Sequence, residues 1–284
     1  MPFLEASPDT RAIESLLADS DASTVNLTVE IILSARGRHE AAIQHLSESE
    51  NRSARRQARA ILSKWMEEDQ ARRPVLALRE LDLSSWASLE DFCWFLSEQE
   101  GRGFSREDGK SVLDGWARRV RQRVASKDPT TQEIHLALQH VLAREEGLKG
   151  NTENYYDPSN SYLHYVLQTG LGIPLTLCLI YIFVGERLHL NIRGLNTPGH
   201  YLAMAGSLVF DPFYAGVALG PSQLSERFGH TASDWADPSC LIASPVSTTQ
   251  RMLTNLVNSY KRNGDQKRLD RMVNYLRLLQ ELPS

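Results

Sequence analysis

A histidine and an aspartate in the second half of the chain follow a long apolar stretch in an order that suits catalysis. Gly172 to Pro174 opens an expected helix, His200 opens an expected strand, and Asp211 closes the next strand. Helix, strand and strand is the order of a Cys-His-Asp site, in which the aspartate fixes the tautomer of the histidine. The nucleophile of such a site sits at a helix N-terminus, where the helix dipole lowers a thiol pKa and backbone N–H groups can hold an oxyanion.

Four short blocks around these residues carry a more specific signal. They resemble, in the same order, the signature blocks of the bacterial SirB-type transglutaminase-like family. The resemblance is strong from about residue 151 to about residue 214 and looser over the helical region before them. The blocks are NYYDPSNSYLHYVL at 154–167, GIPLTL at 172–177, PGHYL at 198–202 and FDPF at 210–213.

The resemblance implies a papain-like, transglutaminase-like core whose nucleophile position has changed. Active proteins of this type carry a cysteine two residues after the helix-opening glycine, a histidine at the start of the following strand, and an aspartate before a proline. In this chain those positions hold Pro174, His200 and Asp211. Proline suits the first turn of a helix, but it has no nucleophile and supplies one N–H donor fewer to an oxyanion.

Cys178 is the candidate substitute for the missing nucleophile. It lies four residues after Pro174, on the same helical face and one turn deeper. Its neighbours Leu177 and Leu179 are apolar, so burial should raise the pKa of the thiol and keep it unreactive. We expect Cys178 to be a core residue, because free cysteine is commonly buried. The alternative is an amide hydrolase or acyl transferase that uses Cys178, or a water activated by His200.

A polar block before the apolar helix is rich in hydrogen-bonding side chains. It could line a cleft and hold a peptide or an amide. It could also be a self-capped turn whose side chains bond their own backbone, and this is the interpretation we favour. The candidate cleft residues are Asn154, Tyr156, Asp157, Asn160 and Tyr162.

The His200 and Asp211 pair likewise has two interpretations, a buried hydrogen-bonded pair that stiffens the sheet or a pair kept for function. Because the nucleophile position holds Pro174, the residues favour a catalytically silent pseudoenzyme. Such a protein would use the ancestral cleft to bind a protein or peptide partner in a regulatory or scaffolding role.

The composition is that of a globular protein and gives no sign of disorder. The 284 residues are 42% hydrophobic and 23% charged, with a formal net charge of −4. Arginines gather at 52–59 and at 118–123, but acidic residues follow the first group and neither group interleaves aromatic residues. We therefore expect solvated helix faces rather than a nucleic-acid site.

A cytoplasmic location without metal or cofactor is expected. The first residues lack a basic segment followed by an uninterrupted apolar one, so no secretory signal is predicted. The apolar run at 173–184 is too short for a spanning helix, which needs about 20 residues. Cys93, Cys178 and Cys240 are odd in number and widely spaced, which argues against disulfides and zinc. The histidines show no ligand spacing, so no metal site is expected.

These patterns predict an α+β protein in three parts. Residues 1–73 show apolar residues at three- and four-residue spacing and form a helical bundle, with a HEAT-like stack as a second interpretation, up to a break at Arg73-Pro74. Residues 74–240 form the transglutaminase-like domain. Residues 245–284 form a helical hairpin, which resembles the tetratricopeptide-like helices that often end members of the family. The strands expected in the middle part lie at 190–194, 200–205 and 207–212, the last two joined at Ala205-Gly206.

Overall fold

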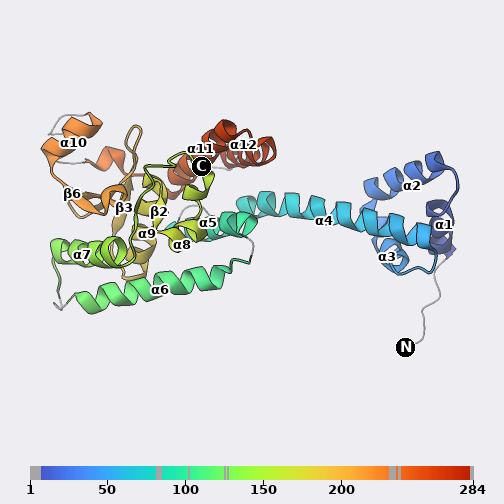
Figure 1. Cartoon of the computed structure of the whole chain (residues 1–284), viewed down its shortest axis with the longest axis horizontal. Helices are drawn as coiled ribbons and strands as arrows, with labels where there is room; N and C mark the ends of the chain where they lie inside the picture. Colours follow the sequence, from blue (N-terminus) through green and yellow to red (C-terminus); the bar gives the residue numbers. More distant parts are fainter. Residues whose placement is uncertain are drawn as a thin grey trace. The chain divides into compact units, whose positions relative to one another are not determined.

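The computed structural model describes residues 8–80, 85–101, 103–124, 126, 128–229, 235 and 238–281, without the side chains of residues 70–80 and 239. The described chain is mainly helical and has a small antiparallel sheet (Figure 1). This confirms the predicted α+β class. Contacts divide the chain into two units, Met1–Leu76 and Ala77–Ser284, so the predicted three-part division remains a prediction.

The first unit is built from helices whose apolar faces meet in one small core. Asp21 begins the second of them, because its carboxylate accepts the N–H groups of Ser23 and Thr24. The helices are α1 (Pro8–Leu17), α2 (Ala22–Ser34), α3 (Arg36–Leu46) and the first part of α4 (Arg52–Glu80). The core consists of Leu17, Ile32, Ile43, Leu46, Ala54, Ala58, Ile61 and Trp65.

The helix break expected at Arg73-Pro74 is not present, because α4 continues through Pro74 to Glu80. A proline inside a helix lacks one backbone hydrogen bond. A helix of 29 residues keeps the bonds on either side of that point, so the local preference of proline does not end it. The two contact units nevertheless divide close by, between Leu76 and Ala77.

The second unit is built around a buried helix, α9 (Pro174–Arg187). Every residue from Pro174 to Gly185 is buried, as expected for a helix that is apolar on all sides. Proline at its first turn suits the start of the helix, since no N–H is needed there. Around α9 pack α5 (Trp86–Glu100), α6 (Arg106–Arg123), α8 (Leu163–Thr169), β3 (Ile192–Leu195) and β4 (Leu202–Ala205), as Figure 1 shows in part.

The main sheet is antiparallel, with the strand order β3-β4-β5-β6. Ile192 pairs with Ala205, and Ala203 pairs with Phe210. The hairpin between β4 and β5 turns at Gly206, which has a φ of 57°. The remaining strands are β5 (Leu208–Asp211) and β6 (Val217–Leu219). Asp211 therefore ends a strand as predicted, whereas His200 lies just before β4 and not within it.

Two long helices end the described chain and share the core of α9. They are α11 (Pro245–Asn263) and α12 (Gln266–Glu281), and the turn between them is made by Gly264 at a φ of 70°. Their residues in the shared core are Met252, Leu253, Leu256, Tyr260, Met272, Tyr275 and Leu279. The helical pair thus belongs to the second unit.

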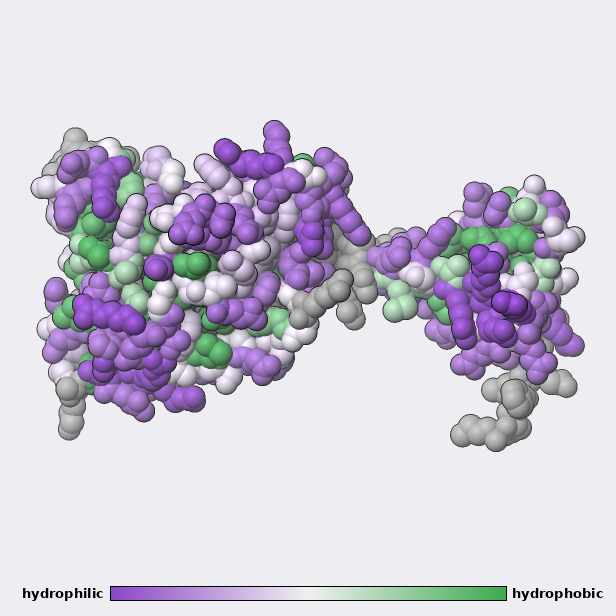
Figure 2. All heavy atoms as spheres, in the orientation of Figure 1, coloured by the Kyte–Doolittle hydropathy of each residue, from purple (hydrophilic) through white to green (hydrophobic). Residues whose placement is uncertain are grey.

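Within the described residues, no helix combines the length and the apolar character needed to cross a bilayer. Figure 2 shows hydrophilic and hydrophobic residues mixed over the visible face of each unit. On α2, Leu27 and Ile31 are 59% and 53% exposed, so the first unit carries some apolar surface of its own.

Candidate functional site

The imidazole of His200 and the carboxylate of Asp211 form a hydrogen bond, with 2.9 Å between Nε2 and Oδ2. Asp211 is fully buried, and the side chain of His200 is 14% exposed. The other carboxylate oxygen, Oδ1, accepts the N–H of Phe213 at 3.0 Å. Because a carboxylate accepts, Nε2 carries the proton, and Nδ1 is left as the ring nitrogen that a ligand can approach.

A turn at 197–200 positions His200. The hydroxyl of Thr197 donates to the carbonyl of His200 at 2.8 Å, and the N–H of His200 donates to the carbonyl of Thr197 at 3.3 Å. Gly199 within this turn has a φ of 70°, which favours glycine. Asp211 is held differently, at the end of β5, where it caps the short helix η3 (Pro212–Tyr214).

Aromatic rings surround the imidazole. The rings of Phe228, Tyr214 and Phe213 have their centroids 5.3, 6.4 and 5.8 Å from that of His200, with Phe213 edge-on. Phe228 is the last residue of α10 (Pro221–Phe228), and the other two lie on η3. The pair therefore lies in largely apolar surroundings, where an ionised group requires a bonded partner.

Cys178 lies in the core and has no access to solvent. Its side chain is fully buried, and its S–H donates to the carbonyl of Tyr201 at 3.3 Å. Burial raises the pKa of the thiol well above its usual range, and the Asp211 carboxylate adds to this effect. Pro174, one turn earlier, is also buried. The structure thus places Cys178 near Asp211, but its S–H bonds to a backbone carbonyl and not to His200.

The polar block at 154–162 is held mainly by bonds within itself. Asn160 is fully buried, and its Nδ2 donates to the carbonyls of Asn154 and Tyr155 at 2.7 and 3.2 Å. Asp157 accepts the N–H of Ser159 at 2.9 Å and so caps η2 (Pro158–Ser161). These side chains hold the shape of the loop, and Asn160 is too deeply buried to contact a ligand.

The tyrosines of the same block lie in three different surroundings. Tyr156 is 50% exposed, and its ring lies 3.9 Å from the guanidinium carbon of Arg262. Tyr162 is buried, and its hydroxyl is 2.6 Å from that of Tyr260 on α11. Tyr155 is 36% exposed and meets the ring of Phe213 edge-on at 6.0 Å, so this tyrosine is the one that reaches the surroundings of His200.

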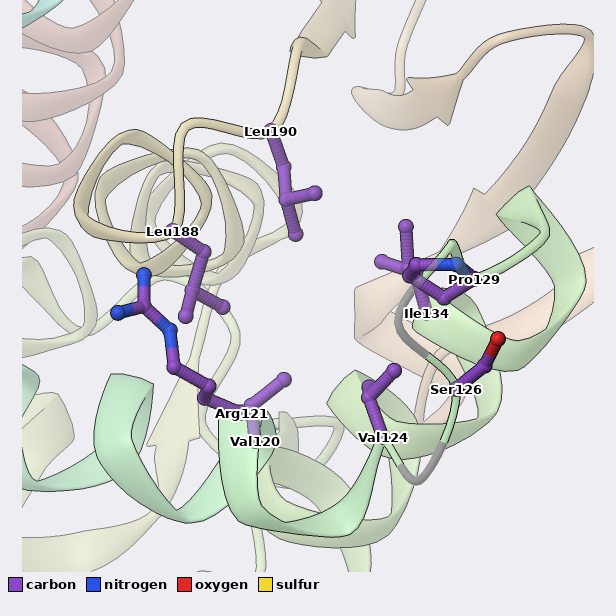
Figure 3. A pocket seen from close by; sticks show the side chains of 8 residues that line it. All are labelled: Val120, Arg121, Val124, Ser126, Pro129, Ile134, Leu188 and Leu190. Atoms are coloured by element: carbon purple, nitrogen blue, oxygen red, sulfur yellow. The ribbon is translucent and has the colours of Figure 1, made fainter.

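Two surface pockets lie elsewhere, and neither is lined by His200 or Asp211. One, of about 330 Å³, is polar and contains residues of the block. It is lined by Glu100, Asp157, Pro158, Ser159, Tyr162, His164, Tyr260, Asn263, Asp265 and Arg268. The other, of about 300 Å³, is lined mainly by aliphatic side chains together with Arg121 and Ser126 (Figure 3). It is lined by Val120, Arg121, Val124, Ser126, Pro129, Ile134, Leu188 and Leu190.

Side chains that bind metals do not gather in groups of three or more within the described part of the chain. The two groups of arginines are partly engaged in the protein itself. Arg119 pairs with Glu145 and Glu146, which follow α7 (Thr131–Leu138) in the π-helical turn η1 (Gln139–Glu145) and just after it. Arg59 donates to the carbonyl of Ser47 at 3.0 Å.

A known protein family matches the part of the chain that forms this site. The model of the transglutaminase-like superfamily matches residues 107–254, which include α9, His200 and Asp211. The chain belongs to the transglutaminase-like superfamily. The matched residues include Pro174 at the start of α9.

The chain is also similar to several curated proteins over less than half of its length. A UPF0162 protein of Xylella fastidiosa (strain 9a5c) is 37% identical over 44% of this chain and 48% of its own length. F-box only protein 21 of Mus musculus is 29% identical over 45% of this chain and 22% of its own length. The chain spans about half the length of the first of these relatives. No solved structure matches the chain.

Several residues around His200 carry no signal in the sequence. Phe228 and Tyr214 approach the imidazole from segments after the two strands, and Arg251 approaches the neighbouring turn from α11. Their spacing from His200 follows no local period. Tyr214 follows β5 directly on η3, whereas α10 brings Phe228 and α11 brings Arg251 to the site.

Proposed function

We propose that this superfamily member is a pseudoenzyme that binds a protein or peptide segment at the surface around His200, in a regulatory or scaffolding role. The observation that carries the proposal is the state of the thiol. Cys178 is fully buried with a raised pKa, and Pro174 offers no nucleophile at the helix start. A thiol that is neither exposed nor ionised cannot attack an amide.

Exposed aromatic side chains near His200 support a binding role. Tyr155 and Tyr214 are 36% and 50% exposed. The ring of Tyr155 contacts that of Phe213, and the ring of Tyr214 contacts those of Phe213 and His200. Tyrosines are enriched at protein interfaces, because one side chain supplies a large apolar area and a polar hydroxyl. The Nδ1 atom of His200 adds a hydrogen-bond acceptor to this surface.

The proposal includes the narrower assignment suggested by the sequence blocks. We place the chain with the SirB-type proteins, take α11 and α12 as a tetratricopeptide-like pair, and assign the protein to the cytoplasm. The four ordered blocks support the first of these assignments. The Asn263 to Asp265 turn between two amphipathic helices supports the second.

The alternative is an amide hydrolase or acyl transferase, and the intact bond between His200 and Asp211 favours it. In such an enzyme Asp211 would orient the imidazole, and Nδ1 of His200 would take a proton from a water that attacks the amide carbon. The amine would leave with that proton. Cys178 could act only after a rearrangement that exposes its sulfur.

A two-part experiment tests the proposed function. The wild type, His200→Ala and Tyr214→Ala are used to capture partners, and cross-links are mapped to residues of this chain; exposed His45→Ala on α3 is the matched control. We expect cross-links near Tyr155 and Tyr214 that both site variants lose and the control keeps. In parallel, a glutamine peptide is assayed for ammonia release with and without an added amine. Turnover that His200→Ala abolishes would replace the pseudoenzyme with the enzyme.

A further inference from the structure

Arg251 on α11 reaches the turn that positions His200. Its Nη1 donates to the carbonyl of Thr197 at 2.8 Å and to the side-chain oxygen of Asn196. The carbonyl of Thr197 also accepts the N–H of His200. The guanidinium carbon lies 5.6 Å from the centre of the Tyr201 ring, so the planar cation rests on a buried aromatic side chain.

The charge of Arg251 has no acidic partner among the described residues. Other partly buried arginines of the second unit follow the usual rule that a buried charge is paired. Arg187 pairs with Glu90 at 2.7 Å, and Arg119 and Arg271 each contact glutamates. Burial lowers the pKa of Arg251, whereas it is raised for Arg187, where the bonds to Glu90 oppose the burial.

One edge of the Arg251 guanidinium is open. Both of its hydrogen bonds use Nη1, while Nε and Nη2 make none within the described part of the chain. These two atoms still reach solvent, unlike Nε of Arg271, which is buried without a partner. The N–H bonds of Nε and Nη2 point in parallel from one edge of the guanidinium, within its plane, and this fork matches the two oxygens of a carboxylate.

The Arg251 guanidinium adjoins the turn that holds His200, since it donates to the carbonyl of Thr197 that also accepts the N–H of His200. The electrostatic effect of Arg251 reaches Tyr155, whose pKa is raised by burial and lowered again by this cation. Tyr155 in turn contacts Phe213, and Phe213 contacts His200. His200 is thus joined to Tyr155 through Phe213 and to the guanidinium through Thr197, so a ligand bound beside His200 lies close to both.

We propose that Arg251 is the anchor of a carboxylate-binding subsite, and that the segment bound beside His200 carries an acidic side chain or a free C-terminus at this point. The inference rests on the proposed function and names the chemistry of its ligand. The carboxylate supplies the counter-charge that the described residues do not provide, and it accepts two N–H groups of a guanidinium that is already held in place by Thr197, Asn196 and Tyr201.

The test follows the Nε–Hε resonance of Arg251 by NMR during titration with two capped peptides. The probes are acetyl-Ala-Glu-Ala-amide and its neutral analogue acetyl-Ala-Gln-Ala-amide, and inorganic phosphate is a third arm. We expect a saturable shift with the glutamate peptide. The glutamine peptide should bind with an affinity at least about tenfold lower, because it cannot form a bidentate charged pair with the guanidinium. Arg251→Gln should abolish the preference, and Arg251→Lys should weaken it, since an ammonium cannot form the fork.

The matched control is Arg193→Gln on β3, an exposed arginine whose Nε bonds the amide of Asn191. It should keep the full preference. Equal binding of both peptides around Tyr155 and Tyr214 would overturn the carboxylate subsite and leave the proposed function standing. If the NMR signals of Tyr155 and Tyr214, followed in the same titration, do not shift with either peptide, both the carboxylate subsite and the proposed function would be overturned. Saturation by phosphate alone would show a free-anion site and also overturn the peptide assignment.

Discussion

The hydroxyl groups of Tyr162 and Tyr260 lie 2.6 Å apart and join the polar block to α11. Both side chains are buried, and burial raises the pKa of Tyr260 to about 12, so both hydroxyls stay protonated at neutral pH. We expect Tyr260→Phe to cost about 1–3 kcal/mol of unfolding free energy, because it leaves the Tyr162 hydroxyl without this partner. The double variant with Tyr162→Phe should cost less than the sum of the two. Denaturant unfolding measures all three, and strict additivity would contradict the coupling.

His200→Ala should destabilise the protein by about 1–3 kcal/mol, because Asp211 stays buried with one partner fewer. Asp211→Asn removes the charge but keeps an oxygen for the N–H of Phe213. We therefore expect Asp211→Asn to cost less in the His200→Ala background than in the wild type. Urea unfolding of the four proteins gives the coupling energy. If His200→Ala unfolds like the wild type, the pair does not stabilise the fold.

The elements that carry the site could be predicted from the sequence, since their signals are local. The apolar run after Pro174 indicates a buried helix, and Ala205-Gly206 between two apolar segments indicates a hairpin. This order of elements is enough to place His200 and Asp211 on neighbouring segments. The exact position of His200 in a turn, however, depends on bonds made by Thr197.

What could not be predicted depends on contacts between distant segments. Arg251 reaches the turn at Thr197 from α11, and Phe228 stacks on His200 from α10. No periodicity relates these residues to the motif blocks. Pro74 shows the converse case, in which a strong local signal for a break is overridden by a long helix.

The three cysteines should react very unequally with a thiol reagent. Cys240 is exposed, whereas Cys93 and Cys178 are buried. Burial also raises the pKa of both buried thiols, so little thiolate forms near neutral pH. Mass spectrometry after brief iodoacetamide treatment should find the native protein modified at Cys240 alone, and the urea-unfolded control modified at all three positions. Rapid native labelling of Cys178 would support the enzyme instead.

Stability should fall as the pH falls below about 6.5. Burial lowers the pKa of His135 below its ordinary value of 6.5, although its Nε2 bonds the carbonyl of Gly216 at 2.8 Å. Over a range of pH below about 6.5, His135 thus binds a proton in the unfolded chain but not in the folded one. The free energy of unfolding therefore decreases as the pH falls through this range. His135→Gln can keep the bond to Gly216 without titrating. Its melting temperature should fall less between about pH 7.5 and about pH 5.5 than that of the wild type. An equal fall would assign the effect to other groups, among them His164, whose pKa burial also lowers.

Gly150 should tolerate no side chain, because of its place under the site. It lies on β1 (Lys149–Gly150), which pairs with β2 (Leu171–Gly172), and a Cβ built on it would overlap the ring of Phe213. Phe213 is buried and meets His200 edge-on, so it cannot move without disturbing the imidazole. We expect Gly150→Ala to cost about 1–3 kcal/mol, the usual effect of overpacking.

The matched control for this substitution is Gly37→Ala. Gly37 lies in the first turn of α3, and an added Cβ would have no atom within 4 Å apart from its chain neighbours and the helix backbone, so alanine there should stabilise the helix by up to about 1 kcal/mol. Thermal unfolding compares the two variants, and the aromatic NMR signals of Phe213 and His200 report the local change. Opposite shifts in melting temperature, with altered Phe213 signals in Gly150→Ala alone, would show that the strand pair β1 and β2 holds the ring of Phe213 in place beside His200. If Gly150→Ala melts like the wild type with unchanged His200 signals, Phe213 has room to move and does not fix the imidazole.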